Sequence, residues 1–135
     1  MAQISQITLA DGQATPANHI FKPFLPQQGS TPAEWRNRET DTTVGDRKIT
    51  IRLSENTNKY NVSIRIADPV LSAIPTDCCT PLNVPAVAYT DFVNIEFSIA
   101  KSATLSNRKD ILAYAKNLLA STVVQSAVHD LEVIW

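Results

Sequence analysis

Residues 86–99 read AVAYTDFVNIEFSI, and apolar and polar side chains alternate along almost the whole stretch. A period of two residues is typical of a β-strand with one buried and one solvated face. Phe92 breaks the pattern, because its ring falls on the side that otherwise carries polar groups. An aromatic ring on a solvated sheet face is typical of a platform on which nucleic-acid bases stack. Two other interpretations stay open: another element covers Phe92, or a bulge shifts the alternation.

Two shorter stretches upstream show the same alternation. Residues 48–54 read KITIRLS and residues 59–67 read KYNVSIRIA, with a polar turn between them. Together with residues 86–99 they predict an antiparallel meander that is apolar on one face and polar on the other. Residues 68–85 contain four prolines and are therefore expected to form an extended loop rather than a strand.

The two ends of the chain complete an α+β prediction. Residues 5–24 predict an N-terminal β-hairpin, because an Asp-Gly turn signal separates two extended pieces. The sheet is expected to occupy residues 32–100. Beyond it the apolar period becomes that of amphipathic helices, which are expected over residues 104–132. The sequence thus predicts a single domain over residues 1–135, with strands first and helices last.

The expected helices must cover the apolar face of the sheet. Thr104 and Ser106 are both candidates for the residue that caps the first helix, and the second helix is expected to carry Val124, Val128 and Leu131. Two helices can cover the sheet within one subunit, or those of a partner subunit can do so by exchange. Periodicity leaves both arrangements open.

Composition places the chain among folded, soluble proteins. Its 135 residues are 44% hydrophobic and 19% charged, which excludes disorder as an answer for the whole chain. The net charge of −1 argues against a generic basic coating, so a nucleic-acid site must gather positive charge on one face. The first residues lack a signal-peptide pattern and no apolar run is long enough to span a membrane, so we expect a cytosolic product.

No pattern indicates catalysis, a cofactor or a metal. The chain has three glycines, no Gly-rich phosphate loop and no nucleophile-elbow motif, so we expect a non-enzymatic protein without a cofactor. His19 and His129 are remote in sequence from Cys78 and Cys79, which argues against zinc. Adjacent cysteines pair with each other only in a strained ring. The two thiols are therefore expected to be free, or else to reach neighbouring subunits in an assembly.

The polar sides of the three predicted strands carry an excess of positive charge. Lys48, Arg52 and Arg65 lie there with one acid, Glu96. Such cations contact phosphates, amides and hydroxyls bind base edges, and an aromatic ring stacks on bases. An ordinary solvated sheet face carries similar residues, so the pattern alone leaves that alternative open. The candidate RNA-binding residues are Lys48, Thr50, Arg52, Asn61, Ser63, Arg65, Phe92 and Asn94.

The order of these segments closely resembles the coat proteins of single-stranded RNA bacteriophages, the leviviruses. The resemblance covers essentially all 135 residues. It implies a coat fold with an N-terminal hairpin, a five-stranded antiparallel sheet and two C-terminal helices. It also implies an intertwined homodimer with one continuous ten-stranded sheet, in which the helices of each subunit cover the partner. The segments that carry it are AEW at 33–35, K-x-T at 48–50, NKY at 58–60, VPAVAY at 84–89 and F-x-N-x-E at 92–96.

The resemblance also implies a function. Such dimers close into an icosahedral shell, with an expected triangulation number T=3, around the single-stranded RNA genome. The protein would then belong to the virion and assemble in the bacterial host cytoplasm. Coat proteins of this family also bind an RNA hairpin at the replicase start and repress its translation. Carried over to matching positions, Thr50 contributes to an adenine pocket, Phe92 stacks on a loop base, Asn94 contacts the RNA and Lys48 contacts a phosphate.

Several positions depart from the family pattern. Phe92 stands where Tyr is common, Arg52 where a small polar residue is common, and Ser63 where a long basic or amide residue is common. Some members link the loop that corresponds to residues 68–85 by intersubunit disulfides through two cysteines set apart. Here Cys78 and Cys79 are adjacent, so rings of disulfides are a hypothesis. The alternative function is a dimeric single-stranded RNA-binding regulator that never assembles. A small α+β enzyme is a third class, which would need a cluster of titratable groups.

Overall fold

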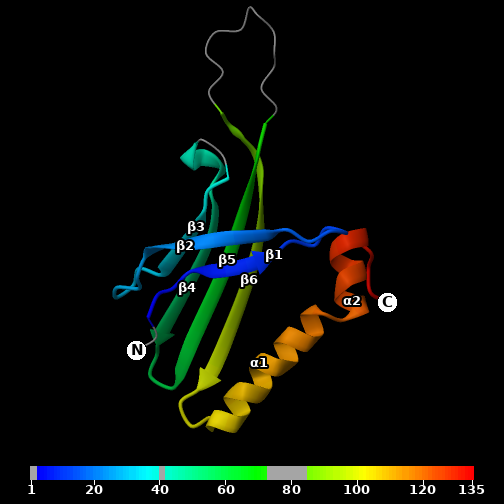
Figure 1. The fold of residues 1–135 in the computed structure, drawn as a ribbon. Helices are drawn as coiled ribbons and strands as arrows, with labels where there is room; N and C mark the ends of the chain where they lie inside the picture. Colours follow the sequence, from blue (N-terminus) through cyan, green and yellow to red (C-terminus); the bar gives the residue numbers. More distant parts are fainter. Residues whose placement is uncertain (1–2, 40–41, 73–84) are drawn as a thin grey trace, which may run out of the picture. The chain divides into compact units, whose positions relative to one another are not determined.

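The computed structural model describes residues 3–39, 42–72 and 85–135 (Figure 1). Two compact units divide the chain: residues 1–98 contain the sheet, and residues 99–135 contain the helices. The strands of the described residues are β1 (Ile7–Ala10), β2 (Asn18–Leu25), β3 (Ala33–Asn37), β4 (Arg47–Glu55), β5 (Lys59–Leu71) and β6 (Val87–Ala100).

The strands lie in the sheet in the order in which they occur in the chain, β1-β2-β3-β4-β5-β6 (Figure 1). From β1 to β5, each strand pairs antiparallel with the next. The predicted hairpin is β1 and β2, and β2 also pairs with β3, with a shift of register between Pro23 and Leu25. The predicted sheet range, residues 32–100, contains four strands among the described residues, β3–β6, and the two hairpin strands extend the same sheet to six. This architecture confirms the predicted α+β class and the meander.

β5 is longer than the sequence indicated. It continues through Pro69 to Leu71, whereas the proline content placed residues 68–85 in a loop. Pairing with β4 ends at Ala67, so the missing N–H of Pro69 costs no hydrogen bond on that side. The Ser72 N–H donates to the Ala86 carbonyl at 2.9 Å, so the residue after β5 is hydrogen-bonded to the residue before β6. Cys78 and Cys79 lie outside the described residues.

The core of the sheet unit is small and lies where the hairpin packs on β3 and β4. Phe21, Trp35 and Ile49 are the buried apolar side chains of this cluster. The Trp35 indole N–H donates to the Ser5 carbonyl at 2.7 Å, which ties the N-terminal segment to β3. On the same sheet face, Leu53 is 52% exposed. One subunit therefore covers only part of its apolar sheet face.

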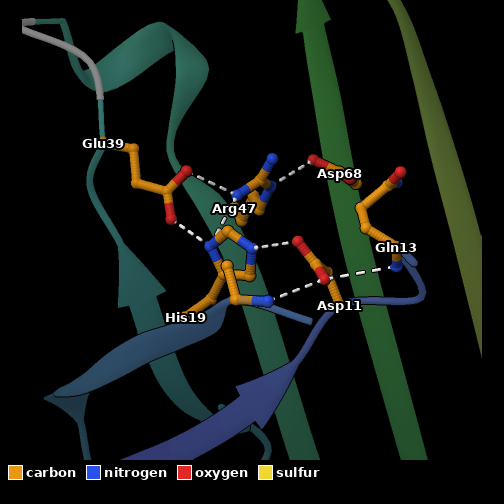
Figure 2. A network of polar contacts seen from close by, with 7 residues as sticks. Asp11, Gln13, His19, Glu39, Arg47 and Asp68 are labelled. Atoms are coloured by element: carbon orange, nitrogen blue, oxygen red, sulfur yellow. Dashed lines mark hydrogen bonds and ion pairs between the residues drawn. The ribbon is translucent and has the colours of Figure 1, made fainter. Parts of the chain in front are cut away.

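Ion pairs and hydrogen bonds between charged side chains link the hairpin to the rest of the sheet (Figure 2). His19 of β2 contacts the Glu39 carboxylate through Nδ1 and lies 3.3 Å from Asp11 Oδ2 through Nε2. Arg47 of β4 donates to Glu39 at 2.7 Å and to Asp68 of β5 at 2.7 Å. The network thus joins the hairpin, the end of β3, β4 and β5.

The helical unit contains α1 (Leu105–Leu119), the short α2 (Thr122–Gln125) and a π-helical turn, η2 (Ser126–Asp130). Thr104 is the N-cap of α1, and its hydroxyl accepts a hydrogen bond from the Asn107 N–H at 3.2 Å. Leu131, which the sequence placed in the second helix, instead adopts φ 54° and ends the turn. The Leu131 N–H donates to the Ser126 carbonyl, and its left-handed backbone stops the helix.

The apolar stripe of α1 is uncovered in one subunit. No side chain of α1 is buried in the described part of the chain. Leu112 is 59% exposed and Leu118 is 62% exposed, which is far more than such side chains show in a packed core. Among the described residues, the apolar side chains of this stripe are thus not buried. Within the described ranges, no helix is long and apolar enough to span a membrane.

Candidate nucleic-acid interface

The register between β4 and β5 brings six of the predicted RNA-binding residues to one face. Directly opposite residues on antiparallel strands point to the same face of a sheet. The alternation along each strand then places every second residue with them. The opposite pairs on this polar face are Lys48 with Ala67, Thr50 with Arg65, Arg52 with Ser63 and Ser54 with Asn61.

Phe92 of β6 lies beside Arg65. The Arg65 guanidinium carbon is 4.2 Å from the centroid of the Phe92 ring, which is a cation–π distance. Phe92 is 51% exposed, so no element among the described residues buries its ring. Of the interpretations that the sequence left open, the structure therefore favours an accessible ring on the polar face.

Five of the predicted residues also line one hollow of about 460 Å³. This size falls within the range of small-ligand sites, roughly 300–1,000 Å³. Phe92, Lys48 and Asn61 are not part of its lining, although Lys48 and Asn61 share the face. The predicted residues in the lining are Thr50, Arg52, Ser63, Arg65 and Asn94, and the other lining residues are Pro32, Ile64, Ile95 and Glu96.

Two buried side-chain atoms on the polar face lack a hydrogen-bond partner among the described residues. Arg52 Nε and Asn61 Oδ1 are buried, and neither has a hydrogen-bond partner among the described residues. A buried polar group without a partner costs about 1–3 kcal/mol, so native structures usually satisfy such groups with protein, water or a ligand. Arg52, which lines the hollow, thus carries a buried N–H without a partner among the described residues, and Asn61 carries a buried oxygen without one on the same face.

Sequence reasoning missed part of the same face. Arg36 of β3 lies opposite Lys48 and also opposite Lys22 of β2. The Arg36 guanidinium carbon is 3.5 Å from the centroid of the Phe24 ring. The alternation around Trp35 could have indicated that Arg36 points to the polar face. The placement of Phe24 depends on the pairing of β2 with β3, which the sequence did not indicate. The polar face therefore extends from β6 to β2.

The described residues contain no group of three or more His, Cys, Asp or Glu side chains that could hold a metal ion. Several titratable side chains gather in the hairpin network (Figure 2). They are engaged in ion pairs between strands. The polar face instead supplies cations, hydrogen-bonding groups and rings, which together suit the binding of a polyanion with exposed bases.

Comparisons with known proteins give a consistent result. The family model described as levivirus coat protein matches residues 2–135. The solved virus-like particle of bacteriophage NT-214 is 50% identical in sequence, with a TM-score of 0.93, over 99% of this chain and 100% of that chain. The virus-like particle of bacteriophage ESE058 is 26% identical, with a TM-score of 0.90, over 99% and 100%. The capsid protein of Pseudomonas phage PRR1 is 23% identical over 96% of this chain and 93% of that protein.

Proposed function

The chain belongs to the levivirus coat protein family, and on that premise we propose that it assembles as dimers into an icosahedral shell around single-stranded RNA. A coat protein is a structural component of the virion, in agreement with the expectation of a non-enzymatic protein. The observation that carries the proposal is the likeness over the whole chain to the virus-like particle of NT-214. Because the family model spans residues 2–135, we infer that both units belong to one coat-protein domain.

Dimerisation follows from the surfaces that one subunit leaves open. β6 is the last strand in the sheet order, and its outer edge has no partner strand in the described part of the chain. An unpaired edge of 14 residues is a template for pairing with another strand. The apolar residues of α1 and the far end of the apolar sheet face are exposed as well. Pairing through β6, with exchange of helices, would give both kinds of surface a partner and join the two sheets into one continuous sheet, which the family resemblance implies to be ten-stranded.

The polar face is proposed to bind RNA. We infer that an RNA hairpin at the replicase start docks there, which would repress translation and mark the genome for packaging. The hollow lined by Thr50, Arg65 and Asn94 supports this site, as does the accessible ring of Phe92. In this arrangement the hollow takes an unpaired base, Phe92 stacks on a loop base, and Lys48 and Arg52 contact phosphates.

The test is expression of the full chain alone in bacteria, followed by electron microscopy and ultraviolet spectroscopy of the purified fractions. Uniform spherical shells that carry RNA are expected, with a triangulation number T=3. A soluble dimer that binds RNA but forms no particles would instead favour the alternative, a regulatory RNA-binding protein.

The hypothesis for Cys78 and Cys79 is tested on the same particles. If both thiols bind neighbouring subunits, non-reducing gel electrophoresis will show ladders of linked subunits that collapse to monomer on reduction. Monomer alone from intact particles would reject intersubunit disulfides.

A further inference from the structure

We propose that the polar face carries a second base-stacking site, made by Phe24 of β2 and Arg36 of β3, which binds unpaired bases of single-stranded RNA. The site is separate from the one around Phe92. It rests on the proposed function, because the occupant is the same class of RNA.

The ring and the guanidinium form a preorganised pair. Phe24 is 57% exposed, although Arg36 lies 3.5 Å from its centroid. Arg36 Nε donates to Glu34 Oε1 at 2.5 Å, and this ion pair holds the guanidinium in place over the ring. Bases stack on both aromatic rings and arginine planes in RNA-binding proteins. The pair therefore offers two stacking surfaces without ordering a flexible side chain first.

A hollow of about 370 Å³ lies beside this pair, and Lys22, Phe24, Arg36, Arg38 and Asp46 contribute to its lining. Arg38 is engaged by Asp46 through two hydrogen bonds, at 3.1 and 3.0 Å. Lys22 makes no ion pair among the described residues and is available for a phosphate. The hollow thus combines space for one base beside the Phe24–Arg36 pair with the ammonium group of Lys22, which has no ion-pair partner in the described part of the chain.

The Phe24–Arg36 pair lies on the same polar face as the site around Phe92 but is separate from it. Arg36 lies directly opposite Lys48, one of the predicted RNA-binding residues. Four strand spacings separate β2, which carries Phe24, from β6, which carries Phe92, and this amounts to roughly 19 Å across the sheet. One base cannot stack on Phe24 and Phe92 together over that distance. A single strand of RNA that crosses the face can contact both.

The first experiment measures binding of a fluorescein-labelled oligoadenylate 12-mer, which forms no hairpin, to the full chain below its assembly concentration. Phe24→Ala should weaken binding by roughly 5- to 150-fold, the range for the loss of one stacked base, and Phe24→Tyr should keep it. Arg36→Gln should weaken binding because the stacking plane is lost, and Lys22→Gln should lower the salt slope by about one phosphate contact. Lys109→Gln, which removes a cation from α1, is the charge-matched control and should leave binding unchanged.

The second experiment separates this proposal from the proposed function. Particles are irradiated with ultraviolet light, and the peptides cross-linked to RNA are identified by mass spectrometry. Cross-links at Phe24 and at Phe92 are expected. Cross-links at Phe92 with none at Phe24 overturn the second site alone, whereas cross-links at Phe24 with none at Phe92 leave it standing and contradict the hairpin site. Unchanged RNA binding by Phe24→Ala, with loss of dimers or particles, would make Phe24 a protein contact and overturn the proposal.

Discussion

Phe92 gives the sharpest test of the proposed hairpin site. The substitution Phe92→Ala should weaken binding of the replicase-start hairpin by about 1–3 kcal/mol, because one base–aromatic stack is lost. The half-exposed ring beside Arg65 supports no core, so the dimer should remain folded. Titration of the labelled hairpin at fixed salt measures the effect, and Phe92→Tyr, which keeps the stack, is the matched control. Equal affinity of the Ala variant and the original chain would contradict a stacking role.

For single residues, the sheet face to which each side chain points was predictable from the sequence. The side chains that it contacts on other strands were not. Alternation alone placed Phe92 and Arg65 on one face, and the structure confirms that placement. The Phe24–Arg36 pair was missed because it depends on a strand pairing with a shifted register at Pro23. Proline and shifted registers remove the period of two that sequence analysis uses. The RNA-binding role of each residue stays a prediction.

Among the elements, α1 depends on its cap. Thr104→Ala should destabilise the protein by about 0.5–2 kcal/mol, because the hydroxyl no longer accepts the hydrogen bond from the Asn107 N–H. Ser106→Ala is the matched control, since Ser106 lies inside α1 and alanine favours a helix. Urea unfolding followed by far-ultraviolet circular dichroism measures both variants. An equal loss in the two would contradict the assignment of Thr104 as the cap.

The attachment of the hairpin should depend on pH. The hydrogen bond to Glu39, followed by that to Asp11, raises the pKa of His19 above its ordinary 6.5. The His19 hydrogen bond in turn lowers the pKa of Glu39 below 4.5, and the backbone N–H of Ala17 is the largest cause that lowers the pKa of Asp11. A raised histidine pKa gives stability that is present below 6.5 and lost as the pH rises through the folded value. Lowered carboxyl pKa values give stability that is lost in acid.

The contribution of this network should therefore be greatest between about pH 4.5 and pH 6.5. Arg47, which faces His19 from β4 and also binds Asp68 of β5, opposes protonation of His19 and moderates the effect. Unfolding free energies at pH 5.5 and pH 8 should differ less in His19→Gln than in the original chain. The same difference in both proteins would show that another group causes the pH dependence.

The limits of elements were less predictable than their existence. The strands at residues 48–54 and 86–99 were evident from local pattern, whereas Thr104 was one of two candidates for the helix cap until the structure identified it. The continuation of β5 through Pro69 was not, because a proline is tolerated where the neighbouring strand has already ended. Leu131 ends the last helical turn with a left-handed backbone, which a leucine in the sequence does not predict.

For the whole molecule, periodicity predicted two apolar surfaces but could not say what covers them. A coat dimer in which each subunit's helices lie on its partner makes the helices essential. Truncation after Ser102 should therefore abolish the soluble dimer and lead to aggregation, because the apolar sheet face loses its cover. Light scattering on the soluble fraction after gel filtration measures this. A soluble dimer of the truncated chain would show that the β6 edge suffices alone.

A point substitution tests the same exchange without removing an element. Leu112 is 59% exposed in one subunit, so an aspartate there should be harmless if α1 faces solvent. If a partner sheet covers the stripe, Leu112→Asp buries a charge without a counter-ion, which is strongly destabilising, and the dimer should dissociate or fail to form. Asn117→Asp adds the same charge on the polar side of the same helix and should leave dimers and particles intact. Normal particles from both variants would exclude helix exchange, whereas loss of particles from Leu112→Asp alone would place α1 in the dimer interface.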